Sequence, residues 1–373
     1  MGQNCLSGIL SESVYKSDTW QNIDDININQ RDGYKLTFEG YVPYESTNFS
    51  NDSIVEILQE HTMGKGIKLV ITGDGYSDRL IENGTFKNDV KKAVQYFFSI
   101  EPLSSFREYF DIASISIISK NEKIGEDTAF GTQYKGEFYS TDYSLPLNNL
   151  LKSMDFVGGT TDNVTVILLL NDEGNNRVHC LMSYNGLSIG LVPNQSARMR
   201  ETLIHEVAGH GFGHLADEYW ERDEVYPDDR RSILESRHKD NWSLNVDFNN
   251  RSDLLSWSLL HDYPAYRYDN YGNDSIYYEG ADGYSRGVFR PNDVSIMMSH
   301  NNVWFNAPSR WAIYRRLMVL SGSYKEEEED LMFAEFLKYD SKNLFNVSAG
   351  NKTKAPAYTV IDFCASPIYS DFP

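Results

Sequence analysis

The chain has 373 residues, enough to bury a large core in one large domain or in two unequal ones. Its 54 acidic and 34 basic residues give a net charge of −20. This charge argues against general nucleic-acid binding, which depends on neutralising phosphates with Lys and Arg, and against residence on an anionic membrane surface. No apolar run is long enough for a membrane-spanning helix.

The first 62 residues are polar and rich in turn-forming residues. They contain one predicted strand pair, at 34–38 and 41–44, because aromatic and β-branched residues gather there. We interpret residues 1–62 as an N-terminal arm or β-rich segment without a function of its own. Residues 63–373 are expected to form the main domain.

From residue 67 the pattern changes to short apolar runs that alternate with helical periodicity. Strands are predicted at 67–72, 112–118 and 164–170, and a helix at 88–98. The run at 164–170 is almost entirely apolar, which predicts a strand that is covered on both faces. Strands interleaved with helices indicate an α/β (α+β) fold with a mixed sheet flanked by helices.

The second half of the chain contains one long segment without clear periodicity. A helix is predicted from about 196, with Ser196 as its cap, to 211. Residues 220–288 are expected to form a long irregular stretch, ordered by its aromatic residues and lining part of a cleft. An amphipathic helix is predicted at 307–320, and the acidic run at 326–330 is interpreted as a solvated helix start.

Residues 205–219 contain three histidines, two glutamates and an aspartate. The segment begins His205-Glu206-x-x-x-His210, one residue longer than the His-Glu-x-x-His pattern of zinc hydrolases. In that pattern two imidazoles and one further donor hold a single Zn²⁺ ion, and a fourth position stays open for water. We therefore predict a zinc site with His205 and His210 as ligands.

The longer spacing has a geometric consequence. Residues five apart on a regular α-helix point about 140° away from each other, so two histidines at that spacing would diverge. A π-bulge widens the turn and returns them to one face, and bulges of this kind occur mostly at functional sites. Gly209 lies within the spacing and eases local rewinding. The sequence predicts either a bulge or an early helix end between His205 and His210.

Four segments of the chain together resemble one known family, the M64 metallopeptidases, which is named for an immunoglobulin A peptidase. These segments are the Gly-Asp-Gly-Tyr turn with its preceding strand at 65–76, then 101–110, the zinc motif through Tyr219 at 205–219, and 290–297. The resemblance implies a zincin-like or metzincin-like fold in which 63–373 is the catalytic domain. It also implies a bacterial, extracytoplasmic zinc metalloendopeptidase that cuts protein or glycoprotein substrates, immunoglobulin among the candidates.

The resemblance to metzincins also bears on the third zinc ligand, which in that group follows six residues after the second histidine. Here that position is Ala216, which cannot bind metal. Asp217 is our choice, and His214 and Glu218 remain alternatives. The carboxylate that does not bind the metal is expected to brace a histidine or the turn. Gly211 and Gly213 are expected to provide the turn after the helix.

Other residues receive roles around this site. Glu206 is expected to act as the general base, and Met297 to occupy a methionine turn beneath the ligand imidazoles. A tyrosine within 263–284 is expected to help polarise the substrate carbonyl. Asp74 is interpreted as a turn former, and Arg290 either pairs with an acidic residue near the cleft or lies on the surface.

The cysteines Cys5, Cys180 and Cys364 lie far apart and show no metal-ligand spacing. Two other functions compete with the peptidase hypothesis. The lengthened histidine spacing would suit a catalytically weakened peptidase fold that acts as a binding module for surface proteins or glycans. A zinc hydrolase acting on a non-peptide amide is the third hypothesis.

Overall fold

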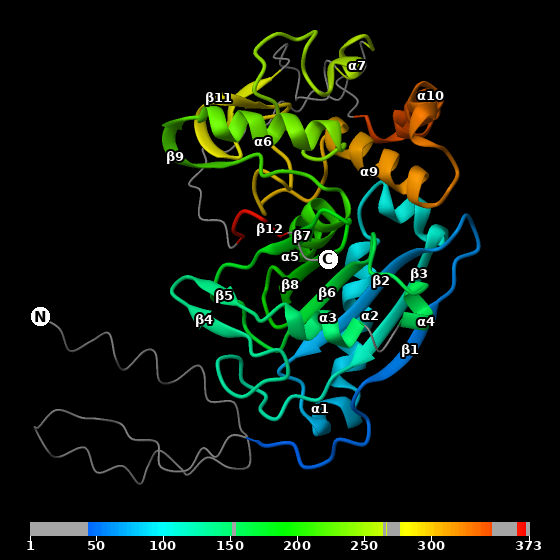
Figure 1. Ribbon diagram of the computed structural model, residues 1–373, viewed down its shortest axis with the longest axis vertical. Helices are drawn as coiled ribbons and strands as arrows, with labels where there is room; N and C mark the ends of the chain where they lie inside the picture. The colour runs from blue at the N-terminus through cyan, green and yellow to red at the C-terminus, as the bar shows by residue number, and fades with distance from the viewer. Residues whose placement is uncertain (1–43, 151–153, 264–265, 267–276, 345–363, 371–373) are drawn as a thin grey trace, which may run out of the picture. The chain divides into compact units, whose positions relative to one another are not determined.

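The computed structural model describes residues 44–150, 154–263, 266, 277–344 and 364–370 (Figure 1). Chain contacts group Pro43–Pro373 into one compact unit, apart from Met1–Val42. The predicted strand pair at 34–38 and 41–44 lies outside the described residues except for Tyr44. Tyr44 is not in a strand, and its hydroxyl donates to Asp78 Oδ1 at 2.7 Å.

A seven-stranded mixed sheet forms the centre of the larger unit (Figure 1). Four of its six strand pairs are parallel, and the pairs β1–β3 and β7–β8 are antiparallel. The strands lie in the order β1 (Ile54–Gln59), β3 (Phe110–Ser116), β2 (Ile67–Asp74), β6 (Thr165–Leu170), β8 (Ser188–Pro193), β7 (Cys180–Ser183) and β12 (Ile368–Ser370). The prediction of a mixed α/β fold is confirmed, and the three predicted strands form within two residues of their expected bounds.

The central strands are buried on both faces, which explains their nearly continuous apolar sequences. Alternate residues of β6 point to opposite sides. Ile167 and Leu169 belong to the core that contains the helices, whereas Val166 and Leu168 belong to the core on the other face. At the edge, β1 pairs with β3 through Ile54↔Ser116, so residues 54–59 are part of the main sheet rather than of a separate arm.

The helix side of the sheet carries α2 (Thr85–Phe97), α5 (Met199–Leu203) and the π-helix Ile204–Phe212 that continues α5. The π-helix packs against β6, β7 and β8. At Gly190 of β8 a Cβ atom would lie 2.6 Å from Val207 Cγ2, so only glycine permits this approach. The predicted start at Ser196 is three residues early, because Ser196 instead closes the turn that precedes α5.

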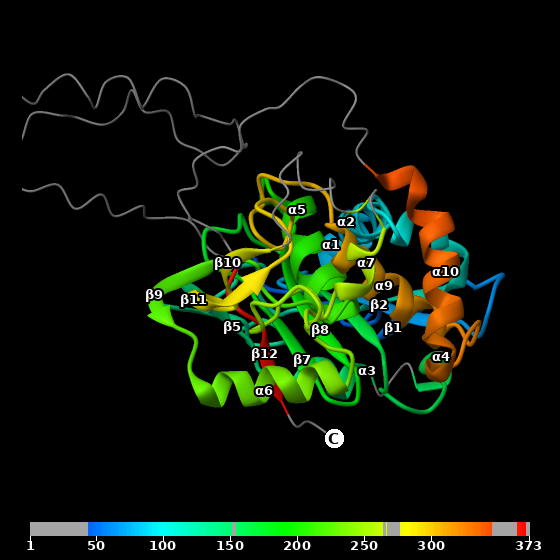
Figure 2. The same cartoon turned by 90° about the horizontal axis from the view of Figure 1, so that it is seen from above.

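Residues 220–290 are more regular than the sequence predicts (Figure 2). A second, three-stranded sheet has the order β10-β11-β9. The elements of this region are β9 (Trp220–Val225), α6 (Asp228–Lys239), α7 (Ser258–His261), β10 (Tyr278–Ala281) and β11 (Gly283–Arg290). The expectation of a long irregular stretch is wrong for the described part, because Tyr226, Leu234 and Val288 belong to a separate small core that orders it.

Two helices cover the end of the main core. Helix α9 (Ala307–Leu320) has the predicted bounds, but it is buried on most sides rather than amphipathic. The acidic run forms the short helix η5 (Glu326–Glu328) and the exposed start of α10 (Glu329–Asp340), which confirms its interpretation as a solvated helix start. Arg310 of α9 forms a two-point ion pair with Asp340 of α10, both bonds at 2.8 Å and both side chains buried.

The remaining elements are short: α1 (Asp78–Glu82), η2 (Leu103–Tyr109), β4 (Gln133–Lys135), β5 (Phe138–Ser140), α3 (Ser144–Leu150), α4 (Met154–Val157) and η6 (Ser341–Asn343). Asp74, at the end of β2, is buried, and its carboxylate accepts hydrogen bonds from Thr128 Oγ1 and from the amides of Phe130 and Thr132. Asp74 therefore fixes the loop at 128–132 as well as forming a turn. Among the described residues, no helix has both the length and the apolar character needed to cross a membrane.

The buried ion pair between α9 and α10 gives a test of this packing. Asp340→Ala should lower the free energy of unfolding by about 3–5 kcal/mol, because it leaves the Arg310 guanidinium buried without its carboxylate. Glu335→Ala, which removes the exposed pair with Lys338 on the same helix, should change it little. Urea unfolding of both variants measures the difference. Equal effects would contradict the assigned role of the buried pair.

Candidate metal centre

His205 and His210 lie on the same side of the π-helix Ile204–Phe212. Their ring centroids are 4.8 Å apart. A π-helix repeats its hydrogen bonds at a spacing of five residues, so it places these two positions on one face. The predicted bulge is thus confirmed, and it extends over nine residues. The alternative, an early helix end between the two histidines, is wrong.

The carboxylate of Asp217 meets both rings. Its Oδ1 atom lies 3.1 Å from Nε2 of His205 and 3.1 Å from Nε2 of His210. All three side chains are almost completely buried, and their ligand atoms lie within 4.8 Å of one another. The structure therefore brings together the three residues that the sequence analysis chose as metal ligands.

The hydrogen bonds of the two Nδ1 atoms determine whether the Nε2 atoms that face Asp217 carry a proton. Nδ1 of His205 lies 2.9 Å from the Ile296 carbonyl oxygen, and Nδ1 of His210 lies 2.7 Å from that of Leu215. A carbonyl oxygen only accepts, so each neutral ring carries its proton on Nδ1. Two Nε2 lone pairs and a carboxylate oxygen then converge without a proton between them. This arrangement fits a cation, and the donor set of two imidazoles and a carboxylate is one that zinc accepts.

Two buried carboxyl groups at the site differ in their electrostatics. Burial raises the pKa of Asp217, but the adjoining His210 and His205 side chains lower it overall. Burial raises the pKa of Glu206, which the neighbouring His210 and His205 side chains only partly offset. Neither oxygen of Glu206 has a nitrogen or oxygen partner among the described residues. Glu206 therefore has acceptor capacity that no nitrogen or oxygen donor of the described residues uses.

Glu218 has a different surrounding from that of Asp217. Its carboxylate accepts from Asn306 Nδ2 at 2.7 and 2.9 Å, from Ser295 Oγ at 2.5 Å and from Asn245 Nδ2 at 3.0 Å. Its amide donates to the Met297 carbonyl at 2.9 Å. Neutral donors thus satisfy Glu218, and it braces the turn that contains Met297.

Met297 lies directly against the π-helix. An ideal Cβ on Gly209 would be 2.4 Å from Met297 Sδ, so the sulfur fills the space that a side chain at 209 would occupy. The turn itself is closed by the amides of Met298 and Ser299, which donate to the Ser295 carbonyl. The structure therefore places Met297 beneath the stretch between the two histidines.

The chain reverses after the π-helix at His214, which has a φ of +51°. Gly213 ends the π-helix and lies in this turn, as expected, with a φ of −79°, whereas Gly211 lies inside the π-helix. Both glycines also allow close packing: a Cβ would lie 2.8 Å from Ile313 Cγ1 at Gly213 and 2.9 Å from Ser188 Oγ at Gly211. The His214 ring packs on Trp242, with 3.8 Å between centroids, and His214 belongs to neither candidate metal group of the described residues.

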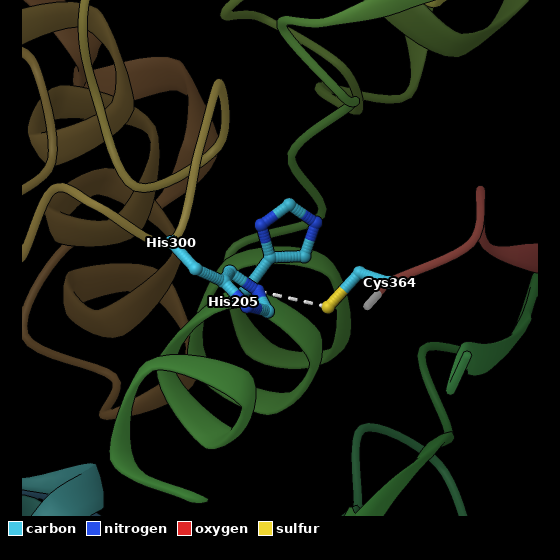
Figure 3. Close-up of side chains that lie close together, drawn as sticks. All are labelled: His205, His300 and Cys364. Atoms are coloured by element: carbon cyan, nitrogen blue, oxygen red, sulfur yellow. Dashed lines mark hydrogen bonds between the residues drawn. The ribbon is translucent and has the colours of Figure 1, made fainter. Parts of the chain in front are cut away.

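Two further residues lie at the site that the sequence analysis did not select. His300 Nε2 is 2.9 Å from Cys364 Sγ, and the His205 and His300 ring centroids are 5.2 Å apart. Figure 3 shows His205, His300 and Cys364 meeting from three separate segments, and their ligand atoms also lie within 4.8 Å of one another. His300 could have been found from its place three residues after Met297. The sequence spacing of Cys364 gave no signal that it lies beside His300.

The other predicted residues have structural partners. Arg290 is buried, donates to the Glu279 and Gly280 carbonyls, and pairs with Asp293 at 3.3 Å. Within 263–284, the described tyrosines include Tyr266 and Tyr277, whose hydroxyls bond to Asp340 and to the Asn250 carbonyl. Tyr268 and Tyr271 lie outside the described residues. A tyrosine that does contact the site is Tyr219, which stacks on His205 with 6.3 Å between centroids.

Comparison with known proteins identifies one family. The model of the family described as IgA Peptidase M64 matches residues 55–263. This match includes the strands β1, β2, β3, β6, β7 and β8 and the whole π-helix. No curated protein matches the chain.

The contact between Gly209 and Met297 gives a second test. Gly209→Ala should lower the free energy of unfolding of the metal-free protein by about 1–3 kcal/mol, because the added methyl group overlaps the sulfur. The same change made in a Met297→Ala background should cost less, since the sulfur is gone. Urea unfolding of the four proteins gives the coupling. If the changes in the free energy of unfolding are additive, the contact between the two residues does not affect stability.

Proposed function

We propose that this chain, which belongs to the IgA peptidase M64 family, is a zinc-dependent endopeptidase that hydrolyses protein or glycoprotein substrates. Membership of the family implies a metallopeptidase. The observation that carries the finer proposal is the convergence of two Nε2 lone pairs and Asp217 Oδ1 in a buried site. Such a cluster of electron-pair donors is costly unless a cation binds it.

His205, His210 and Asp217 would hold the zinc ion in this proposal. When bound, the ion supplies a Lewis acid and lowers the pKa of a coordinated water towards neutrality. Contacts outside the ligand set support the arrangement. The Ile296 and Leu215 carbonyls fix the orientation of the two rings, and outer contacts of this kind typically increase metal affinity.

Glu206 would act as the general base. It follows His205 directly on the π-helix, is fully buried, and has both carboxylate oxygens uncommitted to nitrogen or oxygen donors. Its carboxylate accepts the proton of the attacking water and then donates that proton to the nitrogen of the leaving amine. Burial raises its pKa, which strengthens it as a base and keeps the proton on its carboxyl group until the leaving amine accepts it.

The binding-module hypothesis rested on the lengthened histidine spacing. The π-helix removes that reason, because it turns both rings towards Asp217 despite the extra residue. No contact of the described residues favours a non-peptide amide. A digest of a broad peptide library separates that hypothesis from the peptidase.

Glu206→Gln tests the proposed base. This variant should retain zinc and lose cleavage by about a hundredfold or more, because the amide cannot accept the proton. Glu224→Gln, at an exposed position on β9, is the control and should retain activity. Zinc content by elemental analysis and cleavage of a denatured protein substrate provide the two measurements. A Glu206→Gln protein as active as the control would remove this residue from the mechanism.

The ligand set makes a separate prediction. The protein should bind one zinc ion per chain. Zinc at a free concentration of 100 times its Kd should raise the free energy of unfolding by about 2.7 kcal/mol. His210→Ala and Asp217→Ala should abolish this thermal stabilisation, whereas His214→Ala should keep it, since His214 packs on Trp242 away from the cluster. Zinc titration followed by thermal unfolding measures it. A wild-type chain that takes up no zinc would favour the binding module.

A further inference from the structure

We propose that Cys364 is a fourth, displaceable ligand of the metal centre, and that segment 364–370 holds the peptidase in a latent state. The inference rests on the proposed zinc site. It assigns a role to a thiol for which the hydrolytic mechanism has no use. It also assigns a role to β12, the short strand that pairs with one edge of the main sheet.

The position of the thiol carries the first step. Cys364 is completely buried, and its Sγ atom lies 2.9 Å from His300 Nε2. With His205 and His300 it forms a group whose ligand atoms lie within 4.8 Å of one another. Figure 3 shows the sulfur directed towards the two imidazoles. His205 is common to this group and to the group of His210 and Asp217, so the thiol lies close to one of the proposed zinc ligands.

The chemistry of the surroundings supports a metal-bound sulfur. Thiolate is a preferred ligand of zinc, and the bound metal keeps it deprotonated. The buried Glu206 oxygens, which have no nitrogen or oxygen partner, are in hydrogen-bonding reach of the same thiol. The Cys364 thiol is therefore close both to the proposed zinc ligand His205 and to the proposed base Glu206.

Specific contacts hold the segment in this place. The Cys364 carbonyl accepts from Arg177 Nε at 2.9 Å and from Arg177 Nη2 at 2.6 Å. The Ala365 amide donates to the Val178 carbonyl at 2.7 Å. Further along, the Arg237 guanidinium lies 3.6 Å from the ring centroid of Tyr369. These contacts hold residues 364–369 in place beside β7 and the site.

The segment also covers the edge of the sheet that lies nearest the site. Strand β12 pairs in parallel with β7, with Tyr369 opposite Met182, and β7 packs against the π-helix. An uncovered edge strand presents backbone donors and acceptors to which an extended peptide adds as a further strand. Because β12 uses that edge of β7, an extended substrate cannot pair there while the segment is in place.

The strand that attaches the segment to the sheet is short and lies at its edge. Strand β12 has only three residues, and the Ile368 side chain remains 43% exposed. A short edge strand opens at a smaller cost in free energy than the central strands do. After release, the three ligands His205, His210 and Asp217 remain, and the fourth position opens for water.

A cobalt-substituted protein tests the ligand role without any activity measurement. Thiolate bound to Co²⁺ gives an intense near-ultraviolet charge-transfer band. Wild-type protein should show this band, and Cys364→Ser should lose it while still binding one cobalt ion. Cys180→Ser is the matched control and should keep the band, because Cys180 is buried in β7 but belongs to neither candidate metal group of the described residues. A wild-type spectrum without the band overturns the ligand assignment.

Cleavage kinetics test latency. If the closed form is nine-tenths populated, Cys364→Ser should raise kcat/KM about tenfold. Tyr369→Ala keeps the thiol but loses the contact with Arg237, so it should raise activity and weaken the cobalt band together. It should also increase the rate at which the Cys364 sulfur displaces iodide from iodoacetamide to form a thioether. Unchanged activity in both variants overturns latency.

The outcomes separate this inference from the proposed function. A cobalt–thiolate band with no cleavage by any variant supports the ligand role and contradicts the peptidase. Cleavage by wild type at the same rate as by Cys364→Ser, with no band, overturns the inference and leaves the peptidase intact. An alkylation rate that zinc does not slow in wild-type protein also counts against the ligand role.

Discussion

The candidate metal centre depends on one widened helical turn, because a regular helix would direct His205 and His210 away from each other. A π-helix is uncommon by itself, and neighbouring elements hold this one in shape. Three side chains pack closely against glycines in or at the end of this helix. They are Met297 at Gly209, Ser188 of β8 at Gly211, and Ile313 of α9 at Gly213. The extra residue in the histidine spacing is thus accommodated by close packing on several sides. A change in any of these contacts acts on the metal site through the helix.

Three carboxylates lie buried within this region, and their surroundings separate their roles. The Glu218 carboxylate accepts hydrogen bonds from neutral amide and hydroxyl donors, which hold it in place. Asp217 faces only the inner nitrogens of two imidazoles, and Glu206 has no nitrogen or oxygen donor among the described residues. Buried carboxylates without donors are costly unless a cation or a protonated ligand completes them. The contrast separates Glu218, which has a structural role, from the two carboxylates to which we assign roles in metal binding and catalysis.

Local sequence patterns predicted the elements whose residues lie close together in the chain. The strand at 164–170 was evident because burial on both faces demands an unbroken apolar run, and the spacing of His205 and His210 revealed the bulge because helical geometry is fixed. Long-range contacts were not predictable. The small sheet within 220–290 is ordered by a separate core. Cys364 is held near the site by contacts with Arg177 and Val178 and by the pairing of β12 with β7. None of these contacts leaves a periodic pattern in a single sequence.

His205 belongs to both candidate ligand groups. It therefore lies close both to the other residues of the candidate metal centre and to Cys364, which belongs to the segment that covers the edge of the main sheet. The group with His210 and Asp217 is built within fifteen residues of one helix and its following turn, whereas Cys364 arrives on a short strand held by Arg177 and β7. The two groups therefore differ in the elements that hold them. Opening of the short strand would move the Cys364 sulfur away from His205 but leave the π-helix, its glycine contacts and the hydrogen bonds of Glu218 unchanged. Release of segment 364–370 would thus expose a site that is already assembled, with no rearrangement of the residues proposed to bind the metal.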